Sequence, residues 1–356
     1  MTSISTLGQF QRIQSDTLRT QARLLDLQTQ ATTGKKGVLF GDLGADGRRS
    51  LSTRSTIEQL ENYRNNIAVV DSRAAVMDTS MGRMSQIMTE LRQEFTKLNG
   101  NLSDNTTFLN ELGRRGLREL STLLNTRLDG RYLFAGNDIG TAPIDTNAVE
   151  GTLTTRFNTL IADYRSNTLS GAQVVAQIGQ ALDDPARAYN PAPTGFAADP
   201  LAAPIYPRSL YYSGNPVRAR VDADYDVEYG IRADAAVFRD MFKVLSLAST
   251  LEFDRVADVA EEADYRTILS YGEQLTIQTA TNISTERGKL GVTRREIQNL
   301  RTRHDDVLTV LNLELGQIED ADLADVFTKV QQTQVALQAS FRITAGLQDL
   351  SLLNFL

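Results

Sequence analysis

The sequence contains no cysteine and only one histidine among its 356 residues. Without cysteine, the chain forms no disulfide and offers no thiolate to a metal or a substrate. One histidine is too few for a histidine-based catalytic relay or a histidine-rich zinc site. We therefore expect no enzymatic activity, with no catalytic residue, no bound metal and no cofactor.

Long apolar runs and basic clusters are also missing. No stretch approaches the roughly 18 consecutive apolar residues of a transmembrane helix. The N-terminus has no basic cluster followed by an apolar segment, and its first charge is Arg12, so a cleaved secretory signal peptide is not expected. With a net charge of −7, we expect neither nucleic acid nor a membrane as a partner, because phosphate binding requires a basic surface.

Helical periodicity is the strongest feature that is present. Between Leu60 and Leu102, apolar residues recur at alternating steps of three and four, which is the pattern of a helix packed as a coiled coil. This stripe consists of Leu60, Tyr63, Ile67, Val70, Ala74, Met77, Met81, Met84, Met88, Leu91, Phe95, Leu98 and Leu102. Its four methionines indicate an adaptable core seam rather than a metal-binding box.

Two further stripes follow the first. After a turn-forming stretch at 99–107, a helix is expected over about 108–129, with its leucines inward. These leucines are Leu109, Leu112, Leu117, Leu120, Leu124 and Leu128. From Leu290 to Ile318, steps of three or four residues with one skipped position predict another packed helix, and both His304 and Val307 lie on its apolar side. His304 is therefore interpreted as a structural residue.

The region from 136 to 235 differs in composition and in its hydrophobic pattern. All eight prolines fall between Pro143 and Pro216, and short alternating stretches such as 151–157 and 217–222 predict strands joined by turns. Asp222, Asp224 and Asp226 would share one face if they lay on a strand. The glycine and closing glutamate of a calcium loop are absent, so a solvated face is the better interpretation.

These patterns predict a mainly α fold with a β-rich insert. A long coiled-coil helical stem is built from both chain ends, and a small, mostly β central domain is inserted in it. The expected divisions are an N-terminal helix (1–40), the N-terminal part of the stem (41–135), the β-rich insert (136–235), the C-terminal part of the stem (236–320) and a C-terminal helix (321–356).

The two terminal helices are poor in charge. Between Val330 and Leu356 the only charged side chains are Arg342 and Asp349. Two helices can cover only one seam between them, and burial of a large apolar side chain yields about 1.5–3 kcal/mol. The remaining apolar side chains therefore predict assembly with other subunits. The expected assembly interface consists of Ile4, Leu7, Phe10, Leu18, Leu25, Val330, Leu337, Phe341, Leu347, Leu350, Leu353 and Phe355.

Several segments carry a family resemblance. The segment 130–136, Gly-Arg-Tyr-Leu-Phe-Ala-Gly, followed by Thr-Ala-Pro at 141–143, resembles the signature of the hook–filament junction proteins of bacterial flagella. Segments 30–36 and 211–217 resemble the same family, and 318–322 with 335–340 resemble the terminal domain shared with flagellins. The stretch 40–46 departs from the family's serine-aspartate-proline turn, and a divergent flagellin stays open as the alternative.

The resemblance implies a structural adaptor that joins hook to filament. Such proteins leave the cell through the flagellar type III channel without a cleaved signal peptide, so an extracellular, flagellar location is implied. The implied partners are copies of the chain in a ring, flagellin, the first junction protein, and a cytoplasmic export chaperone on about 330–356. The family places its paired terminal helices in the inner core of the tube. A hydrolase or sugar-binding insert using the three aspartates is a third interpretation.

Overall fold

The computed structural model describes residues 3–102, 105–190, 204–212, 217–252 and 259–353. The chain divides into two compact units, each described by itself. The terminal unit comprises residues 1–62 and 302–356, and the central unit comprises residues 63–301. Helices α2 (Gly47–Gly100) and α10 (Val259–Glu319) each contribute residues to both units.

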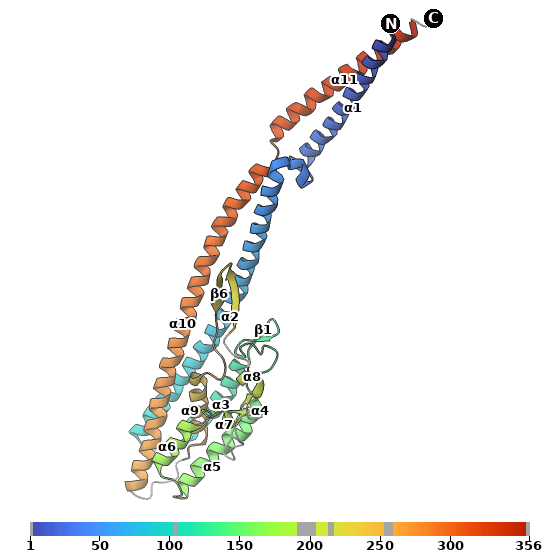
Figure 1. Ribbon diagram of the computed structural model, residues 1–356. Coiled ribbons are helices and arrows are strands. Elements are labelled where there is room, and N and C mark those ends of the chain that lie inside the picture. Colours follow the sequence, from blue (N-terminus) through green and yellow to red (C-terminus); the bar gives the residue numbers. More distant parts are fainter. Residues whose placement is uncertain (1–2, 103–104, 191–203, 213–216, 253–258, 354–356) are drawn as a thin grey trace. The chain divides into compact units, whose positions relative to one another are not determined.

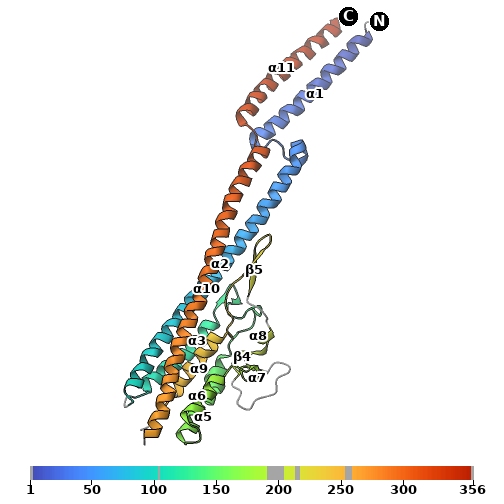
Figure 2. The same ribbon diagram turned by 60° about the vertical axis from the view of Figure 1, so that its left-hand side comes forward.

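The terminal unit is built from two pairs of helical segments. Helices α1 (Ser3–Thr33) and α11 (Leu323–Leu353) lie side by side (Figures 1 and 2). A short 3₁₀ segment, η1 (Phe40–Asp46), leads into α2. The start of α2 and the end of α10 are joined by ion pairs, among them Arg49 Nη2 to Glu314 Oε1 at 2.8 Å.

In the central unit, α2 and α10 form an antiparallel pair. Asp71 pairs with Arg294 and Asp78 with Arg287, so residues later in α2 meet residues earlier in α10. The apolar stripe of α2 is buried from Tyr63 to Leu98, as its periodicity predicts. Burial of this stripe removes a continuous row of large side chains from water and gives the unit its core.

Helix α3 (Thr107–Leu124) returns along α2 as an antiparallel hairpin. Arg83 pairs with Glu119 and Glu90 with Arg115, which fixes the direction of the return. Five of its predicted inward leucines are buried, and Leu128, beyond the helix, is partly buried against the same core. Gly113 lets α9 (Ala236–Thr250) approach closely, because a Cβ there would lie 2.4 Å from the backbone nitrogen of Ser249.

Helix α9 is buried over most of its length. Several short helical segments precede it in the chain. They are α4 (Thr146–Ala148), the π-helical turn η2 (Val149–Leu153), α5 (Thr154–Arg165), α6 (Gly171–Gln180), α7 (Pro185–Ala188) and α8 (Arg208–Tyr212). Lys243 of α9 is buried, and its ammonium donates to Gly179 O at 2.9 Å and Asp183 Oδ2 at 2.7 Å. These bonds satisfy the buried charge and attach the end of α6 to the core.

The strands that the structure describes form three two-stranded pairs. β1 (Arg127–Leu128) pairs antiparallel with β2 (Arg131–Tyr132), and β3 (Tyr189–Asn190) pairs parallel with β4 (Tyr206–Pro207). β5 (Arg218–Asp222) and β6 (Tyr225–Glu228) form an antiparallel hairpin. Its buried Val221 and Val227 pack on apolar residues of α2 and α10 in a small second core.

The expected fold class is confirmed, with long helices from both chain ends and a small central region that carries a few short strands. The prediction of a strand over 217–222 is confirmed by β5, which occupies 218–222. The prediction of a strand over 151–157 is wrong, since this segment is helical in η2 and α5. The described part of the insert therefore contains more helix than the sequence indicates. Two alternations of residue type are too few to separate a strand from an amphipathic helical turn.

The stripe on α10 departs from its prediction at Val307. His304 and Ile318 are buried as expected, but Leu308 is buried in place of Val307. Val307 itself is 40% exposed. Adjacent apolar residues at 307 and 308 satisfy the same spacing rule, so periodicity alone does not choose between them.

Candidate assembly surface

The seam between α1 and α11 mixes aliphatic side chains with small and hydroxyl-bearing ones. Positions at three- or four-residue spacing are buried or half-buried on both helices: Ile13, Thr17, Thr20, Leu24, Leu27 and Ala31 on α1, and Val326, Val330, Thr333, Leu337, Ser340 and Thr344 on α11. The hydroxyls of Thr17 and Ser340 are 2.5 Å apart across the seam. Small residues and a hydroxyl pair supply less apolar burial than the leucine and methionine seams of the central unit.

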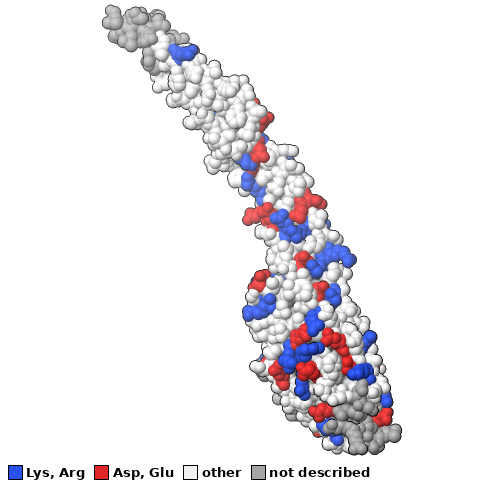
Figure 3. All heavy atoms as spheres, turned by 180° about the vertical axis from the view of Figure 1, so that it is seen from behind, with Lys and Arg blue, Asp and Glu red and all other residues white. Residues whose placement is uncertain are grey.

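The outward side of the same helices carries large apolar side chains. The exposed residues are Leu18 and Leu25 on α1, and Leu323, Phe327, Val335, Phe341 and Ile343 on α11. Val335 retains 66% of its accessible surface. Charged side chains are sparse on the face of this helix pair that Figure 3 shows. A surface that is both apolar and poor in charge is typical of an interaction site.

The predicted interface residues fall into three groups. Leu18, Leu25 and Phe341 are exposed, whereas Val330 and Leu337 are half-buried on the seam side of α11. Ile4, Leu7 and Phe10 belong to α1, and Leu347, Leu350 and Leu353 belong to α11, but their side chains lie outside the described part of the structure, as does Phe355 entirely. The prediction did not include the exposed Val335 and Ile343, because a single helical stripe selects only one face.

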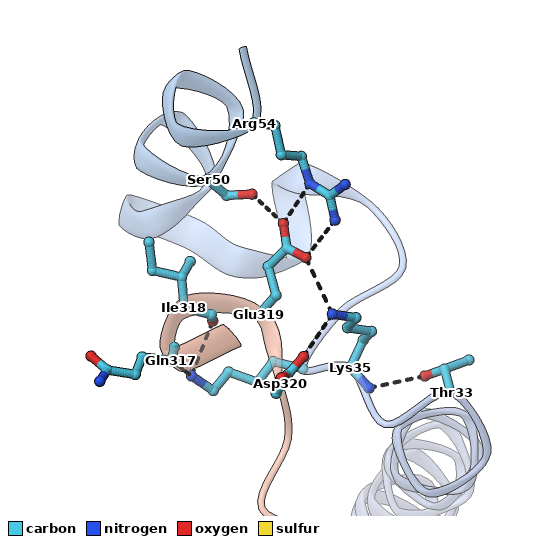
Figure 4. A network of polar contacts seen from close by, with 9 residues as sticks. Thr33, Lys35, Ser50, Arg54, Gln317, Ile318, Glu319 and Asp320 are labelled. Carbon is cyan, nitrogen blue, oxygen red and sulfur yellow. Dashed lines mark hydrogen bonds and ion pairs between the residues drawn. The ribbon is translucent and has the colours of Figure 1, made fainter. Parts of the chain in front are cut away.

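Glu319, the last residue of α10, is the centre of a polar cluster within the terminal unit (Figure 4). It is only 5% exposed. Its Oε1 accepts hydrogen bonds from Ser50 Oγ at 2.5 Å and Arg54 Nε at 2.7 Å. Its Oε2 accepts from Arg54 Nη2 at 2.5 Å and lies 3.4 Å from Lys35 Nζ, which also donates to Asp320 at 2.6 Å.

This cluster explains the charge state of its members. The hydrogen bonds from Arg54 lower the pKa of Glu319 to about 2, with Ser50 and Lys35 contributing, although burial opposes the shift. The hydrogen bond to Asp320 raises the pKa of Lys35. The start of α2, the end of α10 and the connection after α1 are thereby held together by charge-assisted bonds.

The connection after α1 uses a glycine as its helix terminator. Gly34 has φ = +70° and its N–H donates to Gln30 O at 2.9 Å, which is the left-handed cap expected after a helix. The sequence Thr33-Gly34-Lys35 is therefore a helix end. Lys36 then donates through Nζ to the carbonyls of Gln317 and Ile318, satisfying the free end of α10.

The segment 130–136 also has a defined local geometry. Asp129 and Gly130 have φ = 52° and 76°, as in a type I′ turn, and join β1 to β2. Phe134 is buried, packs edge-on against Phe238 at 5.7 Å, and accepts the N–H of Ala233 at its carbonyl. In this chain the segment packs the insert onto α9.

Other candidate sites remain ordinary structure. Asp222 ends β5, Asp224 lies in the turn and Asp226 lies in β6, so the three carboxylates do not share one strand. Within the described ranges, His, Asp and Glu do not gather in any group of three suited to hold a metal ion. None of the helices that the structure describes has the length and hydropathy needed to cross a bilayer.

Comparisons with known proteins agree with this geometry. The bacterial flagellin N-terminal helical region matches residues 4–138, and the bacterial flagellin C-terminal helical region matches residues 274–356. No curated protein sequence matches the chain. A solved structure described as a flagellar hook-associated protein from Vibrio parahaemolyticus aligns with 77% of this chain and 97% of its own, at 10% identity and a TM-score of 0.48. The two family models together cover most of the sequence, and the chain therefore belongs to the bacterial flagellin family of flagellar structural subunits.

Proposed function

We propose that this chain is the junction adaptor that joins the flagellar hook to the filament, and that it assembles through the outward sides of α1 and α11. The observation that carries the proposal is the set of exposed apolar side chains on these helices. A monomer gains nothing from Leu25, Val335 or Ile343 in water, whereas a subunit with several neighbours buries them. Ordering and association costs offset part of that gain.

The adaptor role is supported by the resemblance of residues 130–136 to the junction proteins. We infer a ring of copies that contacts the first junction protein on one side and flagellin on the other. The role is structural, without catalysis. Export through the flagellar channel to an extracellular position follows from this role. A cytoplasmic chaperone that covers about 330–356 before export would shield the exposed residues of α11, including Val335 and Phe341.

Substitution of the outward residues tests the assembly surface. We expect a variant with Leu18, Leu25, Val335 and Ile343 changed to glutamine to keep its helical content and unfolding transition but to lose assembly, measured by sedimentation and electron microscopy. A matched control changes four exposed polar residues of the same helices, Thr29, Thr32, Gln332 and Gln338, to alanine. Normal assembly of the glutamine variant would contradict the proposal.

A deletion strain distinguishes an adaptor from a filament subunit. Loss of an adaptor leaves hooks without filaments and sheds flagellin into the medium. Loss of a filament subunit also leaves hooks, but in that case no other flagellin is shed into the medium. Purified protein that polymerises alone into long filaments would favour the flagellin alternative, and short rings would favour the adaptor.

A further inference from the structure

The terminal unit displays a second apolar patch, in the loop that leads into η1. Val38, Leu39 and Phe40 are consecutive and exposed, and Leu39 keeps 69% of its accessible surface. The loop from Gly37 to Gly41 carries no charge. Three adjacent large apolar side chains in water are unfavourable unless another surface covers them.

Local contacts hold the backbone of this loop in one conformation. The carboxylate Oδ2 of Asp42 accepts the backbone N–H groups of Val38 at 3.0 Å and Leu39 at 2.9 Å. Gly37 passes so close that a Cβ there would lie 2.4 Å from the Cβ of Asp42. The three apolar side chains are therefore presented in a fixed arrangement.

A cavity of about 230 Å³ opens beside the loop. Val38, Leu39, Phe40 and Leu43 line one side of it, and charged groups of the Glu319 cluster line another. The loop thus offers both a protruding apolar edge and a recess that can receive a side chain.

The last turns of α10 provide a surface of the opposite shape. Val307, Val310 and Leu313 are exposed at steps of three residues, and Leu313 keeps 66% of its accessible surface. The residues from Val307 to Leu313 carry no charge. We call this convex row the α10 flank. The buried side of the same helix segment is formed by other residues, His304, Leu308 and Ile318.

We propose that the α10 flank of one copy packs on the loop and cavity at 37–43 of a neighbouring copy. Both patches belong to the terminal unit and both are exposed, so within one copy neither covers the other. A second copy is the indicated occupant because flagellin-family chains polymerise with themselves. Two different surfaces on one chain make a head-to-tail contact, which closes into a ring or continues as a helix. This inference rests on the proposed assembly function and adds the contact between copies outside α1 and α11.

Cysteine cross-linking tests this contact cleanly, because the chain has no cysteine of its own. Leu39→Cys and Leu313→Cys are prepared separately, assembled together and oxidised. We expect a disulfide-linked dimer in the mixture, at least tenfold more abundant than with either variant alone. The matched control, Asn312→Cys, places a thiol on an exposed position of α10 on the side of the helix away from Val310, the middle of the flank, and should not cross-link to residue 39. A disulfide requires the two Cβ atoms to lie within about 4.5 Å, so a random encounter contributes little.

A second measurement covers the case in which a cysteine disturbs assembly. Leu39→Glu and Leu313→Glu should each raise the protein concentration needed for assembly at least tenfold, and the double variant should add little because both remove the same contact. Asn312→Glu should leave that concentration unchanged. Assembly with no cross-link between residues 39 and 313, together with additive glutamate effects, would overturn this contact while leaving the α1–α11 surface intact. Cross-linking of either variant alone would show self-pairing and also overturn it. Failure of the unsubstituted chain to assemble at all would overturn both proposals.

Discussion

The seam of the central unit and the pair α1–α11 bury their large apolar side chains to different extents. In the central unit, Met84, Phe95 and Phe242 are fully buried, and most of the exposed large apolar side chains that the structure describes lie instead in the terminal unit. In the terminal pair, Thr17 and Ser340 lie in the seam while Leu25 and Val335 lie in water. The central unit therefore completes more of its hydrophobic burial within one chain, and the terminal pair leaves apolar side chains for the proposed contacts with other chains.

This difference has consequences for stability as well as for assembly. Isolated helices are marginal in water, and tertiary packing supplies most of their stability. A seam in which alanine, serine and threonine are mixed with aliphatic residues gives α1 and α11 less of that support than the central seam receives. We therefore expect the pair to be the less stable part of the molecule before assembly and to gain stability when neighbours bury its outward side.

The largest expected effect comes from phenylalanine truncation at matched positions. Phe95→Ala should lower the free energy of unfolding of the central unit by about 3–5 kcal/mol, because it leaves a cavity in a filled core. Phe341→Ala, at a position that is 49% exposed, should change monomer stability by less than about 0.5 kcal/mol. Urea denaturation followed by circular dichroism measures both.

The assembly assay gives the reverse order. Phe341→Ala should weaken assembly, whereas Phe95→Ala should assemble normally at temperatures where it is folded. If Phe341→Ala destabilised the monomer as much as Phe95→Ala, the terminal pair would be a closed core of its own, and the contrast between the two regions would disappear.

A smaller effect is expected at the Glu319 cluster. Glu319→Gln keeps the shape of the side chain but removes the charge that Arg54 and Lys35 neutralise. We expect a loss of about 2 kcal/mol from the terminal unit, less than a fully buried pair would give because Arg54 is half-exposed. The control is Glu314→Gln, whose partner Arg49 is more exposed, with an expected loss below about 0.5 kcal/mol. Thermal unfolding of both variants measures the difference, and equal losses would contradict a special role for Glu319.

The pH dependence of the same residue is a separate prediction. The pKa of Glu319 is lowered from 4.5 to about 2 in the folded chain, so its carboxylate stabilises the fold fully above pH about 4.5. That contribution is lost as the pH falls from about 4.5 to about 2. The difference in melting temperature between the unsubstituted chain and Glu319→Gln should therefore be constant between pH 5 and 7 and vanish near pH 2. Other carboxylates are common to both proteins and cancel in this difference, so a difference that persisted at pH 2 would assign the effect to packing instead of charge.

The sequence predicted the regular parts of this structure well. The stripe from Tyr63 to Leu98 was recognisable because one helix face repeats over many turns, and such repetition outweighs local exceptions. The segment 151–157 was too short for its alternation to decide between strand and helix. The displaced burial at Leu308 arose where two apolar residues stand side by side.

The candidate surfaces were only partly predictable, for a different physical reason. Periodicity identifies the helix face that packs within a helix pair. The surface proposed to contact other chains consists of the other faces, and for this reason Val335 and Ile343 were missed. The Glu319 cluster joins residues 265 positions apart, and no local pattern indicates that Arg54 and Glu319 meet. The apolar loop at Val38–Phe40 leads into the stretch 40–46 that departs from the family's turn, and only its exposure identifies it as a surface.

The smallest effect is expected at the hairpin β5–β6, where the comparison of buried and exposed sides is repeated on a smaller scale. Changing Asp222, Asp224 and Asp226 together to asparagine should alter the free energy of unfolding by less than about 0.5 kcal/mol. The side chain of Asp222 accepts a hydrogen bond from the backbone N–H of Ala223 at 2.8 Å. The amide oxygen of asparagine can accept the same bond. Val227→Ala, on the buried side of the same hairpin, should cost more than about 1 kcal/mol, because its side chain packs on α2 and α10.

Calcium should not shift the melting temperature of the unsubstituted chain or of the triple asparagine variant. A calcium-dependent rise of several degrees that disappears in the triple variant would revive a binding role for the three carboxylates, since an ion that binds only the folded chain stabilises it by mass action.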